Sequence, residues 1–400
     1  MADNKDKKVL NVPALRFPEF SGEWEKCVLT EIVERVTRRN KGNVCKLPLT
    51  ISAQYGLVDQ ITFFNKVIAS ADMSNYYLLT KGDFAYNKSY SSEYPWGAIK
   101  RLDRYEYGAL SSLYICFRPL SHVSSDFLMH YFETKKWHQG VSEIAVEGAR
   151  NHGLLNIGIQ DFFATSHYMP QELSEQKKIA AFLNLIEKRI SVQNKIIEKL
   201  ETLIKGICNK SLYTVNGTAI QLGDILIERR ERTVINNQYE VLSSTVKGIF
   251  SQREYFSKDI ASENNVGYKI IRLHDVVLSP QNLWMGNVNY NDNFEVGIVS
   301  PSYKVFSIAE NLDKRYIATL LKTHRALYNY MLVSEQGASI VRRNLNMEAF
   351  EQITFKIPPL SKQEKIGNAI SILQARITSA IRIKTAYEAQ KQWLLTQMFI

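Results

Sequence analysis

Cysteines are few in this sequence: there are four in 400 residues, and no two of them form a Cys-x-x-Cys pair. Disulfide frameworks and thiolate metal sites usually appear as closely spaced cysteines, so we expect reduced thiols in a cytoplasmic protein. Long apolar runs are missing as well, because none approaches the ~18 residues that indicate a membrane-spanning helix. Residues 1–9 are mostly polar and charged, so we expect no secretory signal.

Catalytic motifs are also missing. The sequence holds no Walker-type phosphate loop, no glycine-rich dinucleotide loop and no His-Glu-x-x-His pair, and its histidines lack cysteine partners at zinc-finger spacing. Glu175 and Lys177 have the Glu-x-Lys spacing of many nucleases, but they fall in the first turn of a predicted helix. The Pro-Pro pair at 358–359 lacks the flanking polar and aromatic residues of amino-methyltransferases. We therefore expect no catalytic residue, metal or cofactor on this chain, and a pair of carboxylates in a cleft is left open.

Positive charge is in excess. Lysine and arginine total 50 against 40 acidic residues, which gives a formal net charge of +10. Such a balance favours a nucleic acid or another anionic surface as partner. The length is sufficient for two or three domains with their own cores.

A heptapeptide occurs twice and organises the chain: LSEQKKI at 173–179 recurs as LSKQEKI at 360–366. Each copy opens a heptad pattern, which predicts two long helices that pair as an antiparallel coiled coil. The first seam consists of Ile179, Leu183, Ile186, Ile190, Gln193, Ile197, Leu200 and Ile204, and the second of Ile366, Ile370, Leu373 and Ile377. The second seam becomes polar at Lys384 and Lys391. Ser174 and Ser361 are the expected N-caps.

Weaker repeats extend the duplication to the regions before each helix. Asp83-Phe84-Ala85 is matched by Asp275-Val276-Val277, and the motif at 108–111 is matched at 297–300. A duplicated unit of an α/β globule followed by a helix predicts an α+β protein with two similar domains and pseudo-two-fold symmetry. The expected segments are an N-terminal segment 1–20, a first domain 21–168, a first helix 169–212, a second domain 213–357 and a second helix 358–400.

Three features together resemble the specificity (S) subunit of type I restriction–modification systems, over nearly the whole chain. They are LRFPEF at 15–20 with Gly22 and Trp24, the two helix openings, and LLTQMF at 394–399. The resemblance implies two target-recognition domains, each reading half of a bipartite asymmetric DNA site, with a coiled-coil spacer between them. It also implies a non-catalytic subunit that assembles with two methyltransferase subunits and with restriction subunits. S-adenosylmethionine is then expected on the methyltransferase partner, and ATP and Mg on the restriction partner.

Two other classes of protein are left open. One is a self-contained nuclease or methyltransferase with embedded recognition domains, which would need a complete catalytic motif. The other is a coiled-coil adaptor that binds only protein, which the basic loops of both globules argue against.

DNA contacts require cations near phosphates and Arg, Lys, Asn, Gln or Ser at base edges. In the first domain we expect them from Arg38, Arg39, Asn40, Lys41, Tyr86, Asn87, Lys88, Ser89, Tyr90, Lys100 and Arg101. In the second domain we expect them from Arg229, Arg230, Arg232, Ser279, Gln281, Asn282, Trp284, Arg342, Arg343 and Asn344. The alternative for each basic run is a solvated surface, and for each aromatic residue a place in the core.

Overall fold

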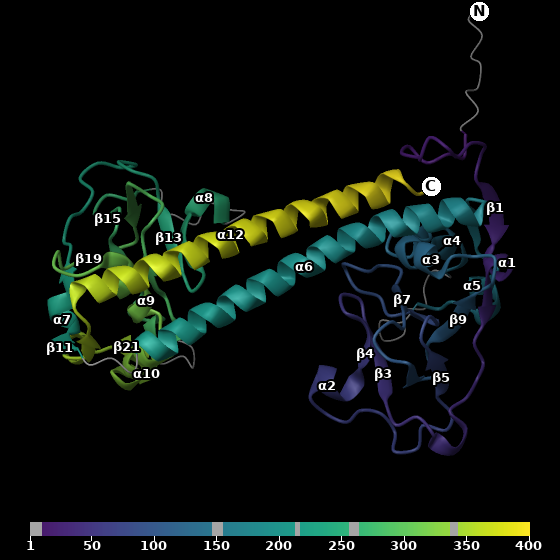
Figure 1. Cartoon of the computed structure of the whole chain (residues 1–400), viewed down its shortest axis with the longest axis horizontal. Helices are drawn as coiled ribbons and strands as arrows, with labels where there is room; N and C mark the ends of the chain where they lie inside the picture. The colour runs from purple at the N-terminus through teal and green to yellow at the C-terminus, as the bar shows by residue number, and fades with distance from the viewer. Residues whose placement is uncertain (1–9, 146–154, 213–216, 256–263, 337–342) are drawn as a thin grey trace, which may run out of the picture. The chain divides into compact units, whose positions relative to one another are not determined.

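The structure is a computed structural model that describes residues 10–145, 155–212, 217–255, 264–336 and 343–400. The chain divides into two compact units, the first with residues 1–192 and 383–400 and the second with residues 193–382. Two long helices, α6 (Leu173–Leu212) and α12 (Leu360–Gln397), contribute to both units (Figure 1). Among the described residues, no helix combines the length and the apolar character needed to cross a membrane.

The first unit is built mainly from two four-stranded sheets. Before α6 its elements are β1 (Glu25–Val28), α1 (Leu29–Ile32), β2 (Val33–Arg35), η1 (Lys41–Asn43), β3 (Pro48–Ser52), β4 (Gly56–Asp59), α2 (Gln60–Phe64), β5 (Tyr77–Thr80), β6 (Phe84–Asn87), β7 (Ala98–Arg101), β8 (Tyr107–Leu110), β9 (Ile115–Pro119), α3 (Ser125–Tyr131), α4 (His138–Ile144), α5 (Ile159–Phe163) and β10 (Ser166–Met169). One sheet has the strand order β2-β9-β6-β7 and the other β4-β3-β8-β5, while β1 pairs with β10. In the second of these sheets β3 and β8 run parallel.

Strand alternation distributes the apolar residues of the first unit between two cores. Phe84 and Tyr86 of β6 belong to the larger core, and Ala85 between them belongs to the smaller one. On β9, Phe117 and Cys116 divide in the same way. Since successive side chains of a strand point to opposite faces, the β2-β9-β6-β7 sheet is buried on both sides.

The larger core of the first unit also receives segments that are distant in sequence. The start of α6 contributes Ile179, Leu183 and Ile186 to it. The chain end contributes Leu394, Leu395, Met398 and Phe399, each no more than 3 % exposed. The first unit is therefore closed by the last residues of the sequence, which no local pattern indicates.

The second unit repeats the plan of the first. Its elements before α12 are β11 (Thr218–Gln221), α7 (Leu222–Ile225), β12 (Leu226–Glu228), β13 (Leu242–Thr245), β14 (Gly248–Ser251), α8 (Gln252–Tyr255), β15 (Lys269–Arg272), β16 (Val276–Leu278), η2 (Leu283–Met285), β17 (Val288–Tyr290), β18 (Val296–Val299), β19 (Lys304–Ile308), α9 (Lys314–Leu321), α10 (His324–Leu332), β20 (Ser334–Gln336), β21 (Arg343–Leu345), α11 (Met347–Glu351) and β22 (Thr354–Ile357). Its sheet β12-β19-β16-β17 has the order of β2-β9-β6-β7. The α+β class and the duplication of the domains are thus confirmed.

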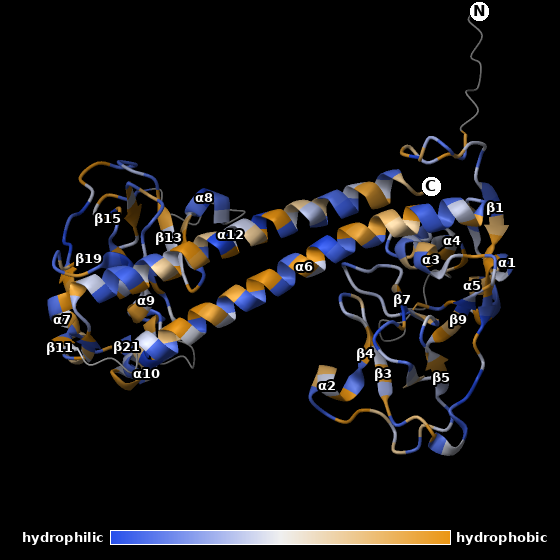
Figure 2. Cartoon of the chain, in the orientation of Figure 1, coloured by the Kyte–Doolittle hydropathy of each residue, from blue (hydrophilic) through white to orange (hydrophobic). Residues whose placement is uncertain are grey.

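The two long helices pack together, as the heptads predict. In the first unit the start of α6 and the end of α12 share one core, and in the second unit the end of α6 and the start of α12 share another. The pairing is antiparallel, and Figure 2 shows apolar and polar residues alternating along both helices. At the polar part of the second seam, Lys391 Nζ donates to Glu187 Oε1 on α6 at 2.6 Å. Nearby, the Arg189 guanidinium of α6 lies 5.5 Å from the centroid of the Tyr387 ring of α12. The two helices therefore stay in contact where the seam is no longer apolar.

The expected serine N-caps are wrong. The helices begin at Leu173 and Leu360, which places Ser174 and Ser361 one residue inside. The residue that the two copies use alike is the glutamine two positions further on. Gln176 and Gln363 are each 3 % exposed, and each ties its helix start to a separate helix of the same unit.

These two glutamines make matching hydrogen bonds. Gln176 Oε1 accepts from the backbone N–H of Ser124, the N-cap of α3, and its Nε2 donates to the Pro170 carbonyl. Gln363 Oε1 accepts from the backbone N–H of Asp313, the N-cap of α9, and its Nε2 donates to the Pro358 carbonyl. A buried amide needs both kinds of partner, so the repeat keeps a glutamine at this position.

Candidate nucleic-acid interface

The basic segment that follows β2 is held by a buried asparagine. Asn40 is fully buried; its Nδ2 donates to the carbonyls of Cys45 (2.9 Å) and Met73 (3.3 Å), and its Oδ1 accepts from the Cys45 N–H at 2.9 Å. These bonds fix the turn, and the neighbouring Arg39 and Lys41 are exposed. Of the predicted residues here, Asn40 therefore shapes the segment and the cations form its surface.

The Arg39 side chain is held in place by uncharged groups. Its Nη1 donates to the Asn75 carbonyl at 2.7 Å, and its guanidinium lies 4.2 Å from the centroid of the Tyr77 ring. Arg39 and Tyr77 are also partners in an antiparallel β-bridge. An arginine over an aromatic face keeps its positive charge while it loses side-chain freedom.

Arg38, the preceding residue, points to a buried carboxylate. Asp83 is 2 % exposed and accepts a hydrogen bond from the Thr80 N–H at 2.8 Å. Arg118 Nη2 lies 3.0 Å from Asp83 Oδ1, and Arg38 Nη2 lies 3.5 Å from Oδ2. A buried carboxylate requires such partners, because an unpaired buried charge is strongly destabilising.

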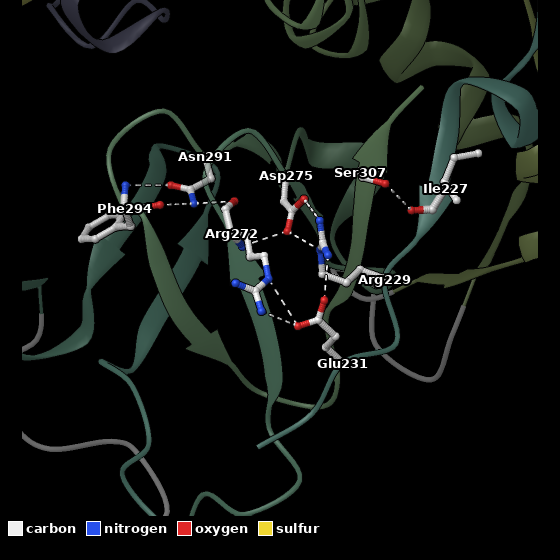
Figure 3. Close-up of polar contacts among 8 residues, drawn as sticks. All are labelled: Ile227, Arg229, Glu231, Arg272, Asp275, Asn291, Phe294 and Ser307. Carbon is white, nitrogen blue, oxygen red and sulfur yellow. Dashed lines mark hydrogen bonds and ion pairs between the residues drawn. The ribbon is translucent and has the colours of Figure 1, made fainter. Parts of the chain in front are cut away.

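The corresponding aspartate of the second unit is held differently (Figure 3). Arg229 Nε and Nη2 donate to the two oxygens of Asp275 at 2.8 and 3.0 Å, and its Nη1 donates to Glu231 at 2.8 Å. Arg272 Nη2 donates to the other oxygen of Glu231 at 2.8 Å. The hydrogen bond to Asp275 is the main cause that raises the pKa of Arg229, and the hydrogen bond from Arg272 is the main cause that lowers the pKa of Glu231.

Arg232 occupies the position in the second unit that Arg39 has in the first. It forms an antiparallel bridge with Lys269, and its Nη1 donates to the Gly267 carbonyl at 2.9 Å. Thr233 follows it as Asn40 follows Arg39: it is 3 % exposed, and its hydroxyl donates to the Asn265 carbonyl at 2.7 Å. The two basic segments are therefore built on the same backbone frame.

The residues predicted around β6 and β7 lie mostly inside the first unit. Tyr86 is fully buried, stacks on Phe162 with ring centroids 4.8 Å apart, and donates its hydroxyl to the Trp96 carbonyl. Burial raises the pKa of Tyr86. Arg101 bonds the carboxylates of Asp103 and Asp126, and burial lowers the pKa of Lys100.

The stretch from Asn87 to Tyr90 leads from β6 toward the surface. Asn87 Oδ1 accepts from the Ser89 N–H at 3.0 Å, and Lys88 Nζ donates to the Ile157 carbonyl at 3.3 Å. Tyr90 is 41 % exposed. A nucleic acid would thus find Ser89 and Tyr90 accessible, while Asn87 and Lys88 are half-buried.

In the second unit, the predicted residues after β16 meet those at the start of β21. The Arg343 guanidinium lies 4.7 Å from the centroid of the Trp284 ring, and the Arg343 N–H donates to the Gln281 carbonyl at 3.1 Å. The backbone N–H of Ser279 donates to the Asn287 carbonyl, and the N–H of Asn282 donates to the Ser279 carbonyl. Asn344 and Gln281 are exposed, and Arg342 lies outside the described residues.

The sequence prediction did not include four cations that belong to these surfaces: Arg118, Lys269, Arg272 and Lys304. All four lie on strands, where a basic residue among apolar ones gives no local sign of a binding surface. Lys269 is 6 % exposed; burial lowers its pKa, and so does the charge of Lys304. These cations could be placed beside the basic segments only from the register of the strands, and that register follows from the fold and not from the local sequence.

A cluster of possible metal ligands lies elsewhere in the first unit. His130, Glu133 and Glu187 place one ligand atom each within 4.8 Å of one another. The Lys391 ammonium already lies between the carboxylates, 2.7 Å from Glu133 and 2.6 Å from Glu187. Burial by itself raises the pKa of Glu133, but His130 and Lys391 outweigh it and hold that pKa at about 2. The cluster is therefore an ion-paired link between the α3 region, α6 and α12.

Residues 220–386 match the family model described as the type I restriction modification DNA specificity domain. The match includes β12, Arg229, Arg232 and the second basic segment. The first and second basic segments have the same backbone arrangement, because an arginine of each forms an antiparallel bridge to a strand. A comparison with curated proteins finds no match.

Solved structures agree in fold with the whole chain. An S subunit of a type I restriction–modification system from M. genitalium is 13 % identical, with a TM-score of 0.59, and the match covers 97 % of this chain and 99 % of that one. A structure from a study of complex assembly and conformational transition of the type I R-M system is 12 % identical, with a TM-score of 0.50 and coverage of 94 % and 97 %.

Residues 220–386 therefore belong to the type I restriction modification DNA specificity domain family, and the chain as a whole has the fold of a type I S subunit. Neither the family model nor the fold supports the alternative of a self-contained nuclease or methyltransferase. The basic segment after β12 lies inside the matched domain, and the segment after β2 lies in the equivalent part of the first unit.

Proposed function

We propose that this chain is the specificity subunit of a type I restriction–modification system, that each of its two domains reads one half of a bipartite, asymmetric DNA site, and that the paired helices set the distance between the halves. The observation that carries the proposal is the pair of basic segments after β2 and β12. Both segments have the same backbone bridge and the same arginine–carbonyl hydrogen bond, but the side chains around them differ. Two similar readers with different surfaces suit two different half-sites.

The proposed partners supply the chemistry. Two methyltransferase subunits bring S-adenosylmethionine, and restriction subunits bring ATP and Mg, while this chain is the non-catalytic scaffold. The sequence, which carries no complete catalytic or cofactor motif, supports this division of roles. Because the complex acts on DNA, we infer that the chain works in the cytoplasm.

Sequencing of methylated bases in a host that carries the chain with its methyltransferase partner tests the proposal. We expect a methylated motif of two short half-sites separated by an unread gap. Replacing residues 28–165 with the equivalent domain of a relative should change one half only. Methyl transfer by this chain without a partner would instead support the self-contained methyltransferase.

The spacer is tested by insertion. Four residues added between Leu203 and Leu212 lengthen α6 by about 6 Å, because an α-helix rises ~1.5 Å per residue. The gap should then grow by about one or two base pairs, since each rises ~3.4 Å. The half-site sequences should not change. An active variant with an unchanged gap would show that the helices do not set the spacing.

A further inference from the structure

Six of the cations around the two basic segments lie next to a carboxylate. Each of the following has a carboxylate oxygen within 4.0 Å: Arg38, Arg118, Arg229, Arg230, Arg272 and Lys304. Arg39 and Arg232 differ, because within the described residues neither forms an ion pair. Both are nevertheless positioned, each through an Nη1 that donates to a backbone carbonyl.

Arg39 and Arg232 are equivalent in strand register. Each bridges the first residue of the strand that it contacts, Tyr77 of β5 and Lys269 of β15. Each donates to the carbonyl two residues before that bridge partner, Asn75 in the first unit and Gly267 in the second. The next N–H along each strand also returns a hydrogen bond, from Leu78 to Arg38 and from Ile270 to Glu231.

The side chains around this shared arginine have diverged. Arg38 before it is replaced by Glu231, and Tyr77 beside it is replaced by Lys269. Two recognition domains that read different sequences still meet the same sugar–phosphate backbone. A residue that stays the same while its neighbours change is therefore suited to the part of the DNA that does not vary.

We propose that Arg39 and Arg232 each bind a phosphate of the DNA backbone, one at each half-site, and hold the duplex without reading its sequence. This inference rests on the proposed function. The guanidinium can use Nη1 for the carbonyl and still present its other N–H groups to a phosphate in a bidentate pair. In the second unit Lys269 adds a second positive charge beside Arg232, whereas in the first unit the Tyr77 ring lies against the Arg39 guanidinium.

The test measures duplex binding by the complex of this chain with its methyltransferase partner, over a range of salt concentrations. Arg39→Ala and Arg232→Ala should each weaken binding to the specific duplex and to an unrelated duplex by the same factor. Each should also reduce the slope of log K against log salt by about 0.9, the value for one phosphate contact. The double variant should lose about twice that slope, because the two sites are independent.

Matched controls remove the same charge elsewhere. Lys26 on β1 and Lys356 on β22 are exposed, and within the described residues neither has an ion-pair partner, so Lys26→Ala and Lys356→Ala should leave the slope nearly unchanged. The methylated motif should be the same in all variants. Lysine at either position, as in Arg39→Lys, should restore most of the slope, which a purely structural role would not explain.

Three results would overturn the inference or its basis. A change in one half of the methylated motif would mean that the arginine reads bases. Unchanged binding and slope, in a complex that still methylates a bipartite motif, would refute the phosphate contacts and leave the proposed function intact. A wild-type complex that methylates no specific motif would refute the proposed function itself.

Discussion

The two units have one sheet of the same strand order, but the cation that pairs with the buried aspartate comes from different elements in the two. In the first domain Arg118 on β9 pairs with Asp83 at 3.0 Å. In the second domain Ser307 stands at that place on β19, and the guanidinium comes from Arg229 after β12 instead. Figure 3 shows the result: Ser307 bonds the Ile227 carbonyl, and Arg229 lies beside Asp275.

This contrast shows which features the duplication has kept. A buried carboxylate needs a positive partner, but any strand or loop that reaches it can supply that partner. The partner arginine therefore lies at different sequence positions in the two units although the fold is the same. The pattern of surface charges differs between the units as a result. In the first unit both cations beside Asp83, Arg38 and Arg118, are partly exposed. In the second unit Arg229 is less exposed, and the more exposed Arg272 is held by Glu231.

The two units also differ in that the core of the first one includes the last residues of the sequence. The largest loss of stability should therefore come from a substitution at this chain end. Phe399 is 1 % exposed and lies against Trp24 and Phe127 in the first unit. Phe399→Ala should destabilise that unit by about 3–5 kcal/mol, the usual cost of emptying a buried aromatic site. Hydrogen exchange, followed separately for the two units, should show the loss in the first unit only.

The control for this variant lies six residues earlier. Trp393 is 55 % exposed, so Trp393→Ala removes a large aromatic group without opening a core cavity. It should change the exchange of the first unit very little. Equal losses for the two variants would mean that the end of α12 acts through helix formation and not through the core.

The second prediction concerns the ion pair between Arg16 and Glu175 at the start of α6. Arg16 Nε and Nη2 donate to the two oxygens of the buried Glu175 at 2.7 Å each, and Trp24 Nε1 donates to it at 3.2 Å. Arg16→Ala leaves this carboxylate buried without its cation, which should cost about 3 kcal/mol or more in the first unit. In the second copy Lys362 stands in place of Glu175 and is exposed, so Lys362→Ala should cost almost nothing there. Urea unfolding with exchange detection measures both losses.

A small loss for Arg16→Ala would contradict this prediction. The variant Arg16→Ala combined with Glu175→Gln provides the check, because a neutral side chain at 175 no longer needs the cation. The double variant should regain part of the lost stability. If it were less stable than Arg16→Ala alone, the pair would act by shape and not by charge.

The sequence predicted the helices and the duplication because both leave periodic signals. Heptad spacing marked Ile179 and Ile366, and both are buried. It left both a core place and a DNA contact open for Tyr86, which is in the core, and it could not predict that Arg229 is held by Asp275. Those outcomes depend on strand register and on residues far away in sequence. The same reason applies to the buried chain end: LLTQMF is a motif in the sequence, but nothing local indicates the surface that it covers.

The third prediction uses acid to separate the two units. Glu133 has a pKa of about 2 in the folded chain, below its ordinary value of 4.5, so its ionised form stabilises the first unit. That contribution is complete above about pH 4.5 and is lost as the pH falls through about 2. We expect the first unit to lose more stability than the second between these pH values, measured by urea unfolding with exchange detection. In Lys391→Met, where the ammonium is gone, this pH dependence should be weaker.

The last comparison is one in which the two units should behave alike, and its effects are the smallest. Gln176 and Gln363 make the same pair of hydrogen bonds in their own units, from a backbone N–H at an N-cap and to a proline carbonyl. Replacing either by alanine leaves one buried donor and one buried acceptor without a partner, at a cost of about 1–3 kcal/mol. Gln176→Ala should affect the first unit and Gln363→Ala the second, by similar amounts in hydrogen exchange.

Glutamate at these two positions separates the two hydrogen bonds. It keeps the acceptor for the N-cap N–H but loses the donor to the proline carbonyl, so its stability should fall between those of wild type and alanine if the bond to the N-cap dominates. A glutamate variant less stable than the alanine variant would show that the proline carbonyl, now facing a carboxylate, matters more. Unequal losses for the two alanine variants would mean that the repeated heptapeptide has been kept for different reasons in its two copies.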